Sequence, residues 1–411
     1  MSTEKVADAV SAAVKHERLA LIAPLVRLTR DFDLAEDCLQ DAVERALSHW
    51  PKDGIPDNPV AWLSVAARRR ALDLLKRAQT ETTKLPLLHD MVKSFDIQPE
   101  GPSSPYDDDR LKLLFACCHP ALPLPGRVAL TLKTVTGLST REVARAFLVS
   151  EATIGQRLLR AKTKITNAGI ALRVPPEDQL AGRIDGVLAV VYLLFNEGYY
   201  ATEGEPLRDG LAREAIQLGL LLVELLPGHG EARALLALML LQHSRRSARL
   251  SSDGALVPLD EQDRGVWDHA EIRVGLHALA GTSGGPPGPY ELQAMIAALH
   301  ATASHAAHTD WERVVRAYDA LLAIQHNPVI ALNRLVAVSF RDGPEPALAA
   351  LPPIAAALPG YPLLPAVRAD LLRRAGRFAE AGAAYRDAVS AARTEAERAF
   401  LRRRLAEVTG D

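Results

Sequence analysis

Cysteine is scarce in this sequence of 411 residues, which contains three: Cys38, Cys117 and Cys118. Three thiols make no disulfide framework, and a reducing compartment fits. Cys-x-x-Cys spacing is absent, and adjacent cysteines are awkward as tetrahedral ligands, so the sequence predicts no metal. We expect Cys117 and Cys118 to be small buried apolar groups.

Long apolar runs and a signal peptide are also missing. The N-terminus, MSTEKVADAV, is charged, and the run LGLLLVELL is too short to span a membrane and carries Glu224. We therefore expect a soluble cytoplasmic protein with no membrane partner. The formal charge of −2 gives no global nucleic-acid signature, so any DNA-binding face must be local.

Motifs of enzyme active sites are not found either. There is no Walker loop, no G-x-G-x-x-G, no H-E-x-x-H and no G-x-S-x-G. The sequence predicts no catalytic residue, no cofactor and no enzyme. Aromatic residues make up only 5%, whereas alanine and leucine dominate, which favours helices throughout. The predicted fold class is all-α.

Residues 137–165, GLSTREVARAFLVSEATIGQRLLRAKTKI, predict two helices joined by a tight turn. Ser139 and Ser150 stand where an N-cap hydroxyl would accept from free backbone N–H groups, and Glu142 completes a capping box with Ser139. One apolar stripe runs along the second helix: Ile154, Leu158, Ala161 and Ile165.

The second of these helices is basic. A helix-turn-helix with a basic second helix suits the phosphates that flank a major groove, with the first turn facing base edges. An ordinary helical hairpin with a solvated basic face is the alternative. The candidate DNA-binding residues are Ser150, Glu151, Thr153, Gly155, Gln156, Arg157, Arg160 and Lys162.

Two helices of opposite charge are predicted nearer the N-terminus. DFDLAEDCLQDAVERALSHW (31–50) has an apolar stripe of Leu34, Cys38, Val43, Ala46 and Leu47 under an acidic face. VAWLSVAARRRALDLLKRA (60–78) is basic outside a core-facing side that we expect to include Trp62. The loop PKDGIPDNP, rich in turn residues, separates them. Two opposite faces suggest two partners, a basic protein surface and a nucleic acid.

This acidic–basic pair resembles region 2 of bacterial extracytoplasmic-function (ECF) sigma factors, and the helix-turn-helix is similar to their region 4. The resemblance implies that the acidic helix docks on core RNA polymerase through Asp37, Gln40, Asp41 and Glu44. It also implies that the loop captures an unpaired base of the −10 element while the basic helix assists melting. The residues implied at −10 are Trp50, Lys52, Asn58, Arg68, Arg69, Lys76 and Arg77, with Trp50 as the stacking residue.

Residues 80–109 predict a flexible linker, because they are polar, Pro-rich and acidic at their end. A plain tether is one interpretation. The resemblance implies the other, a segment that threads the polymerase cleft, where Asp107, Asp108 and Asp109 imitate nucleic-acid charge.

After residue 174 the sequence leaves the ordinary ECF pattern. Thr309-Asp310-Trp311, Asp342-Gly343-Pro344 and Ala375-Gly376-Arg377 recur at a spacing of 33 residues, which is typical of tetratricopeptide (TPR) repeats. Generic packing of helical hairpins is the alternative. The middle unit is degenerate, because Pro346, Pro352 and Pro353 interrupt its helices.

Two polar groups in this extension are weighed as sites. Asn196, Glu197, Tyr199 and Tyr200 either line a pocket or interface or belong to simple turn chemistry. For His300, His305 and His308 we expect a solvated or core-edge role, since only Asp310 lies near to complete a metal site.

The whole chain resembles ECF sigma factors that carry a long TPR-like extension, the group called ECF42. The resemblance implies a transcription initiation factor that binds core RNA polymerase and promoter DNA, recognises the −35 and −10 elements and opens the duplex. The extension would be regulatory, with a protein or small-molecule partner.

The alternative is a one-component helix-turn-helix regulator with a TPR sensing module, which would not need the acidic helix. The predicted domains are region 2 (1–79), the linker (80–109), region 4 (110–173), a helical extension (174–290) and TPR-like repeats (291–411).

Overall fold

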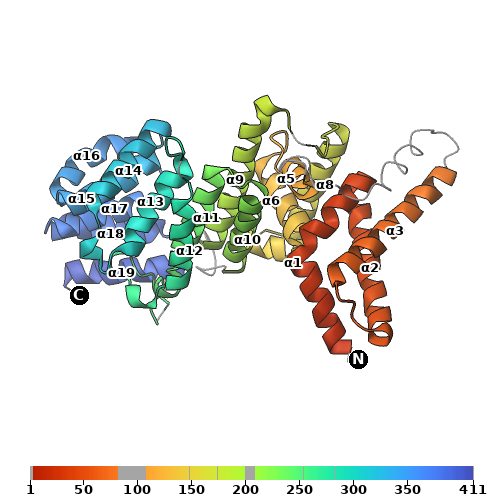
Figure 1. The fold of residues 1–411 in the computed structure, drawn as a ribbon. Coiled ribbons are helices and arrows are strands. Elements are labelled where there is room, and N and C mark those ends of the chain that lie inside the picture. The colour runs from red at the N-terminus through yellow and green to blue at the C-terminus, as the bar shows by residue number, and fades with distance from the viewer. Residues whose placement is uncertain are drawn as a thin grey trace. The chain divides into compact units, whose positions relative to one another are not determined.

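The computed structural model describes residues 3–81, 108–147, 149–173, 175–199, 209–252, 254–282 and 284–410. Every regular element among these residues is a helix, which confirms the predicted all-α class, and Leu250 and Leu256 form an isolated β-bridge. The chain divides into two compact units, Met1–Val191 and Tyr192–Asp411 (Figure 1). Within the described ranges no helix is both long and apolar enough to cross a membrane.

The first unit begins with a bundle of three helices that all pack on one another: α1 (Thr3–Thr29), α2 (Phe32–Asp53) and α3 (Pro59–Glu81). Asp31 caps α2, because its carboxylate accepts from the backbone N–H groups of Asp33 and Leu34. The buried side of α2 is formed by Ala35, Cys38, Leu39, Ala42, Ala46 and Trp50. Cys38 and Ala46 are buried as predicted, but Leu47 is 39% exposed, so the inward face is rotated from the predicted stripe.

Shorter helices complete this unit, and its last part is the beginning of α9 (Glu177–Tyr199). These helices are α5 (Asp109–Cys117), α6 (Leu124–Thr131), the π-helical turn η2 (Leu132–Thr136), α7 (Thr140–Ala146) and α8 (Glu151–Asn167). α6 and α7 both pack on α8, and α1 packs on α5 and η2. The three-helix bundle and the shorter helices therefore form one packed body.

Arg18 of α1 is the main polar link inside that body. It is 7% exposed, donates to the carbonyl oxygen of Thr134 at 3.3 Å, and forms an ion pair with Glu36. Gly137 lies against this side chain with φ of +79°, and a Cβ at Gly137 would collide with Arg18. A second link joins Arg27 to Asp109, with 2.8 Å between Nε and Oδ2.

The second unit is a succession of helices in which chain neighbours pack on each other. It contains the end of α9, α10 (Asp209–Leu225), α11 (Gly230–His243), α12 (His269–Ala280) and α13 (Pro289–Thr302). Short 3₁₀ turns lie at Arg246–Ala248, Arg264–Val266 and Ala306–His308. The predicted break at Pro227-Gly228 falls between α10 and α11.

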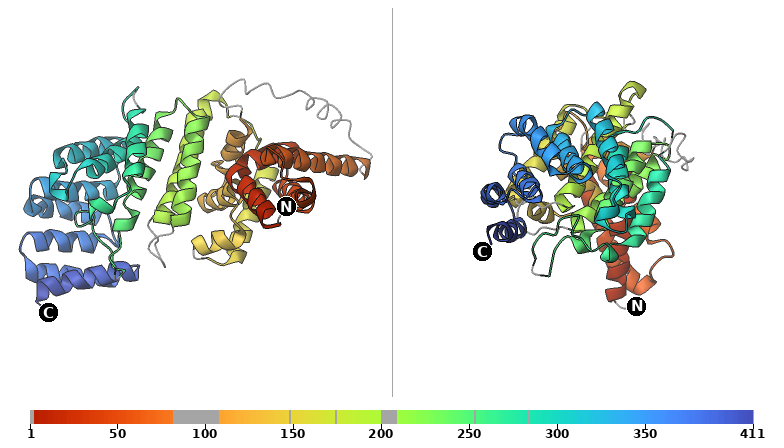
Figure 2. Two further views of the ribbon diagram at one scale, coloured as in Figure 1. Left: turned by 60° about the horizontal axis from the view of Figure 1, so that its bottom comes forward. Right: turned by 90° about the vertical axis from the view of Figure 1, so that its left-hand side faces the viewer.

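Three helical hairpins end the unit, and Figure 2 shows them from two further sides. They are α14 (Trp311–Ile324) with α15 (Pro328–Arg341), α16 (Pro344–Ala356) with α17 (Leu364–Arg374), and α18 (Phe378–Ala391) with α19 (Glu395–Thr409). Their starts reproduce the predicted repeat, and each interior is apolar, as in the cluster of Ala381, Tyr385 and Ala388 around Leu401.

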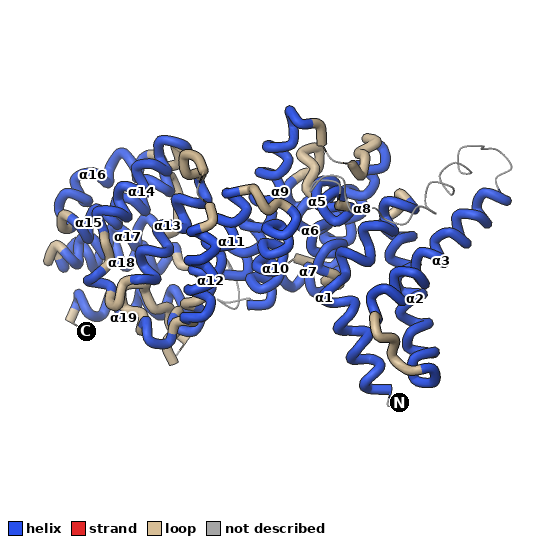
Figure 3. Tube along the Cα trace, in the orientation of Figure 1, coloured by secondary structure: helices blue, strands red, loops and turns tan. Residues whose placement is uncertain are grey.

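The prediction that proline interrupts the middle repeat is wrong. α16 starts at Pro344 and runs through Pro352 and Pro353 to Ala356 (Figure 3). Each of these two prolines removes one helical hydrogen bond, but the φ of proline is compatible with a helix, and α16 continues past them to its end. Pro346 lies in the first turn, where the N–H has no helical partner in any case.

Candidate nucleic-acid and protein interface

The helix-turn-helix forms with the caps that the sequence predicts. The Ser139 N–H donates to Glu142 Oε2 at 2.7 Å, and the Glu142 N–H donates to Ser139 Oγ at 3.1 Å, which is the predicted capping box. Ser150 caps α8, because its Oγ accepts from the N–H of Thr153 at 3.1 Å. Both helices therefore start at fixed points, and the turn between them is short.

One side of α8 is anchored and the other is open. The four predicted stripe residues are all buried: Ile154, Leu158, Ala161 and Ile165. On the opposite side Glu151, Gln156 and Arg160 are exposed, and Gly155 and Arg157 are half-buried. Leu159 is 66% exposed among them, an apolar side chain on a mainly polar surface. This side of α8 presents the candidate base-reading and phosphate-binding groups to solvent.

Several of the predicted DNA contacts already have protein partners, and Glu151 lies 4.0 Å from Arg141. Ser150 and Thr153 are joined through their hydroxyl groups at 2.8 Å within the cap. Lys162 pairs with Asp33 at the start of α2, with 2.5 Å between Nζ and Oδ1. The remaining cations among the predicted DNA contacts on α8 are Arg157 and Arg160.

The acidic side of α2 lies on the surface of the bundle. Asp37, Gln40 and Glu44 are exposed, whereas Asp41 is half-buried. Asp41 Oδ2 lies 2.8 Å from Arg45 Nε, and its Oδ1 lies 3.4 Å from Arg70 Nε. Asp41 therefore has a structural role between α2 and α3, while the three exposed residues, with Leu47 beside them, form a surface that a protein can contact.

The basic side of α3 is also on the surface. Arg68, Arg69, Lys76 and Arg77 are exposed, as is Lys52 in the last turn of α2. Asn58 fixes the start of α3, since its Oδ1 accepts from the N–H of Ala61 at 3.0 Å. The bundle thus carries an acidic surface on α2 and a basic surface on α3.

The burial that we expected for the two tryptophans is reversed in the structure. Trp50 is only 2% exposed, whereas Trp62, which we expected in the core, is half-buried. The rings meet edge to face with 5.4 Å between centroids, so Trp62 covers Trp50. In this conformation the Trp50 ring is closed to an unstacked base, because Trp50 follows Ala46 by one turn on the buried side of α2.

Two of the three acids at the end of the predicted linker have structural partners. Asp108 caps α5 and pairs with Arg110 at 2.9 Å. Asp109 pairs with Arg27 at 2.8 Å and with Lys112 at 3.5 Å. Neither carboxylate is available to imitate nucleic-acid charge in this conformation, which corrects that interpretation. Asp107 lies outside the described residues.

The paired cysteines behave as the sequence predicts. Cys117 and Cys118 are free thiols that are at most 1% exposed, and burial raises the pKa of Cys118 to about 11. Thiols held in the protonated form are poor metal ligands. Across the part of the chain that the structure describes, no group of three His, Cys, Asp or Glu side chains is placed to hold a metal ion.

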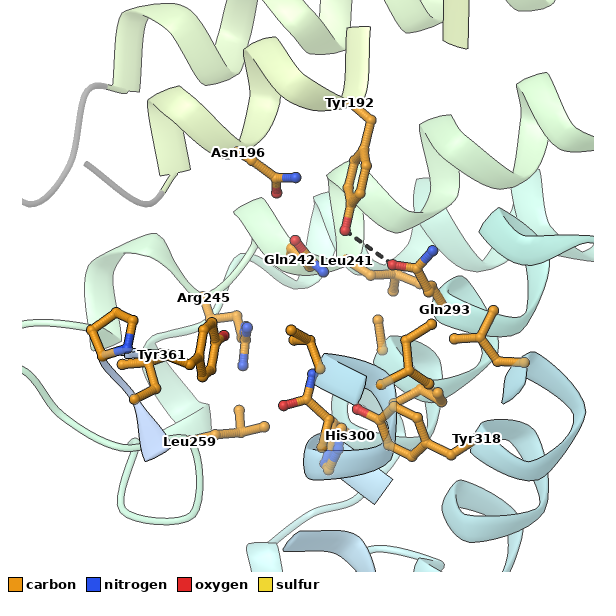
Figure 4. Close-up of a pocket in the computed structure, with 18 of the residues that line it drawn as sticks. Tyr192, Asn196, Leu241, Gln242, Arg245, Leu259, Gln293, His300, Tyr318 and Tyr361 are labelled. Carbon is orange, nitrogen blue, oxygen red and sulfur yellow. Dashed lines mark hydrogen bonds between the residues drawn. The ribbon is translucent and has the colours of Figure 1, made fainter. Parts of the chain in front are cut away.

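The structure also shows a site that sequence reasoning largely missed, a pocket within the second unit (Figure 4). Of the polar stretch singled out in the sequence, Asn196 lines this pocket. Tyr199 instead packs inside the unit, where Arg249 lies 3.8 Å from its ring centroid. Tyr200 lies outside the described residues. His300 lines the pocket, but nothing in the spacing of the histidines pointed to this role.

Two different protein-family models match the three-helix bundle and the helices that include the helix-turn-helix. Residues 13–81 match Sigma-70 region 2, and residues 112–165 match Sigma-70 region 4. Residues 183–283 match a family of unknown function, DUF6596. No solved structure matches the chain.

Individual proteins with similar sequences add to these family matches. An uncharacterized protein of Rhizobium meliloti (strain 1021) is 42% identical over 401 residues, which covers 96% of this chain and 95% of the relative. The "Probable ECF RNA polymerase sigma factor SigI" of two Mycobacterium tuberculosis strains is 31% identical over 173 residues, covering 41% of this chain and 58% of that protein. The chain therefore belongs to the same family as the Rhizobium meliloti protein, and its regions 2 and 4 make it a sigma factor that acts in transcription initiation through a DNA-binding helix-turn-helix.

Proposed function

We propose that the protein is a sigma factor of the ECF type, which docks on core RNA polymerase through the exposed acidic side of α2. The observation that carries this proposal is the pair of surfaces on one bundle: Asp37 and Glu44 on α2, and Arg68 and Arg69 on α3. An acidic surface complements a basic protein, and a basic surface complements phosphate, so one bundle can contact polymerase and DNA together. A one-component regulator has no use for the acidic surface, and the match to region 2 favours the sigma factor.

Promoter recognition divides between α8 and α3 in this proposal. The first turns of α8, with Glu151 and Gln156 exposed, enter the major groove at −35 while Arg157 and Arg160 approach phosphates. The basic side of α3 holds the −10 strand, and Lys52 and Asn58 lie at the two ends of the preceding loop. Trp62 is the better placed of the two tryptophans to meet an unstacked base, because it is half-buried at the bundle surface.

The extension is proposed to regulate this activity, and its first helix supplies the physical link. Arg183 of α9 donates to the carbonyl oxygen of Phe115 in α5, and its guanidinium lies 5.8 Å from the Phe115 ring centroid. Ile184, Val187 and Leu188 are buried within the Met1–Val191 unit. The helices that support region 4 therefore share a core with the start of the extension. The ECF42 grouping and the TPR interpretation of the repeats stay predictions.

Reversing the acidic surface tests the proposed polymerase contact. The variant Asp37→Arg with Glu44→Arg should lose co-purification with core polymerase and promoter-directed run-off transcription. Both residues are exposed and have no ion-pair partner among the described residues, so the fold should persist. Asp41 is left unchanged because it holds Arg45 and Arg70.

The matched control is Asp387→Arg, an exposed acid on α18. It should transcribe like the wild type. If the double variant retains polymerase binding while circular dichroism shows an intact fold, α2 is not the docking surface.

A truncation tests the proposed regulatory role separately. A chain ending at residue 199 keeps all of α9 and so keeps the core around Phe115. We expect its transcription in the same assay to fall below that of the full-length chain. Equal output from the two chains would show that the repeats have no influence on initiation.

A further inference from the structure

The Tyr192–Asp411 unit contains a pocket of about 630 Å³, within the size range of sites for small molecules. Residues of α9, α11, α13, α14, α15 and α19 line it, together with the segment 361–363. Figure 4 shows Tyr192, Tyr318 and Tyr361 around this space, with Leu241 and Leu259 among them. Rings and aliphatic side chains make a wall that suits a flat apolar body.

Two buried polar atoms in this wall have no protein partner. Gln242 Oε1 and His300 Nδ1 are both inaccessible to solvent and make no hydrogen bond with any described residue. A buried polar atom without a partner costs roughly 1–3 kcal/mol, so such atoms are rare unless a ligand or solvent completes them. Both belong to residues that line the pocket, but neither atom is open to its space, so a ligand reaches them only when the side chain turns.

The charged groups of the lining favour an anion. They are Arg245, Arg393 and Glu397. Glu397 is already committed to the cap of α19, since its Oε2 accepts from the N–H groups of Arg393 at 3.0 Å and Thr394 at 3.3 Å. The Arg393 guanidinium is exposed and has no partner among the described residues. The pocket therefore holds more positive than negative charge that a ligand can meet.

His300 adds polarity to the pocket without adding charge. Burial, followed by the positive charges of Arg245 and Arg264, lowers the pKa of His300 to about 3. The imidazole is neutral at physiological pH and can accept or donate one hydrogen bond. Tyr192 is fixed nearby, because its hydroxyl donates to Gln293 Oε1 at 3.0 Å.

We propose that this pocket binds a small aromatic anion, with its ring against the tyrosines and its acidic group paired with Arg393 beside Arg245. This inference concerns the second unit alone and does not depend on the sigma-factor proposal. It assigns a ligand class to a part of the chain that matches, in residues 183–283, a family of unknown function.

Isothermal titration calorimetry of the full-length protein tests the proposal with three probes that share one ring system. They are naphthalene-2-carboxylate, its neutral carboxamide and the cationic 2-naphthylmethylamine. We expect one carboxylate to bind per chain, on the order of tenfold more tightly than the carboxamide, as one charge-assisted contact would give. The amine should bind more weakly still. Equal affinities for the three probes, or no saturable binding at millimolar concentration, would overturn the proposal.

Two variants locate the binding. Asn333 is exposed on α15 and lines the pocket, so Asn333→Trp should fill the space and abolish carboxylate binding without disturbing the core. Arg393→Gln should weaken the carboxylate severalfold and leave the carboxamide unchanged. The control is Arg386→Gln, which removes an exposed arginine of α18 outside the pocket. Binding that survives Asn333→Trp, or that weakens equally in the Arg386 control, would place the site elsewhere.

Discussion

Lys162 on α8 and Asp33 on α2 form an ion pair although 129 residues separate them in the sequence. Lys162 is one of the cations that we predicted to approach promoter phosphate. A lysine that is paired with a carboxylate cannot neutralise a phosphate at the same time. If Lys162 approaches promoter phosphate as predicted, Asp33 of region 2 competes with DNA for the charge of this lysine.

Removing the competing carboxylate should strengthen DNA binding by the free protein. In Asp33→Asn, Lys162 becomes available, so the slope of log affinity against log salt should steepen by up to about one unit. The check is a salt titration of full-length protein on a promoter duplex. Asp37→Asn, an exposed acid on the same helix without an ion-pair partner among the described residues, is the control and should leave the slope unchanged. Identical slopes for Asp33→Asn and the wild type would show that the pair is irrelevant to DNA binding.

Two substitutions on α8 should separate positioning from base readout. Arg160→Ala should weaken −35 binding for all sequences and reduce the salt slope by about one unit, because an exposed arginine there meets phosphate. Gln156→Ala should instead change which −35 sequences are selected from a randomised library. If the library outcome for Gln156→Ala matches the wild type, the first turns of α8 do not read bases.

The two tryptophans should respond in opposite ways to truncation. Trp50→Ala removes a buried ring and should lower the free energy of unfolding by about 3–5 kcal/mol. Trp62→Ala, at a half-buried position, should cost clearly less and should impair promoter opening instead. Chemical denaturation and permanganate footprinting of the open complex distinguish the two effects. A stable Trp50→Ala protein that fails to open DNA would restore Trp50 as the stacking residue.

Stability of the second unit should fall in mild acid because of His300. An unfolded histidine takes up a proton near pH 6.5, whereas the buried one has its pKa lowered to about 3. The contribution is complete above pH 6.5, and below it the free energy of unfolding should fall by about 1.4 kcal/mol per pH unit. His300→Gln should lose this slope in denaturation curves recorded between pH 7 and 5. His326→Gln, an exposed position on the loop after α14, should keep it.

Local signals were sufficient to predict most of the fold and part of the interface. The Ser139–Glu142 capping box and the stripe from Ile154 to Ile165 depend on residues a few positions apart, and both are confirmed. The burial of Trp50 was missed because the predicted stripe ended at Leu47, whereas the buried side of α2 runs through Ala46 to Trp50. Which side of a helix is buried depends on packing against other helices, and residue spacing alone does not determine it.

Contacts between distant segments could not be predicted at all. Arg18 donates a hydrogen bond to the Thr134 carbonyl. His300 lines a pocket to which five further helices also contribute residues. Asn196 was the residue for which the sequence suggested a pocket, because it stands in a polar cluster after a long apolar run, whereas His300 was weighed only as a metal ligand. The acidic side of α2 was recognised in advance because charge periodicity on an exposed helix is a local property.

The placement of α9 limits where the extension can be separated from region 4. A recombination event that joined a new extension after residue 173 would remove Ile184, Val187 and Leu188 from the core of the first unit. It would also remove Arg183, which caps the carbonyl of Phe115. A replacement extension joined at the end of region 4 would have to supply the side chains that the first part of α9 now contributes to this unit.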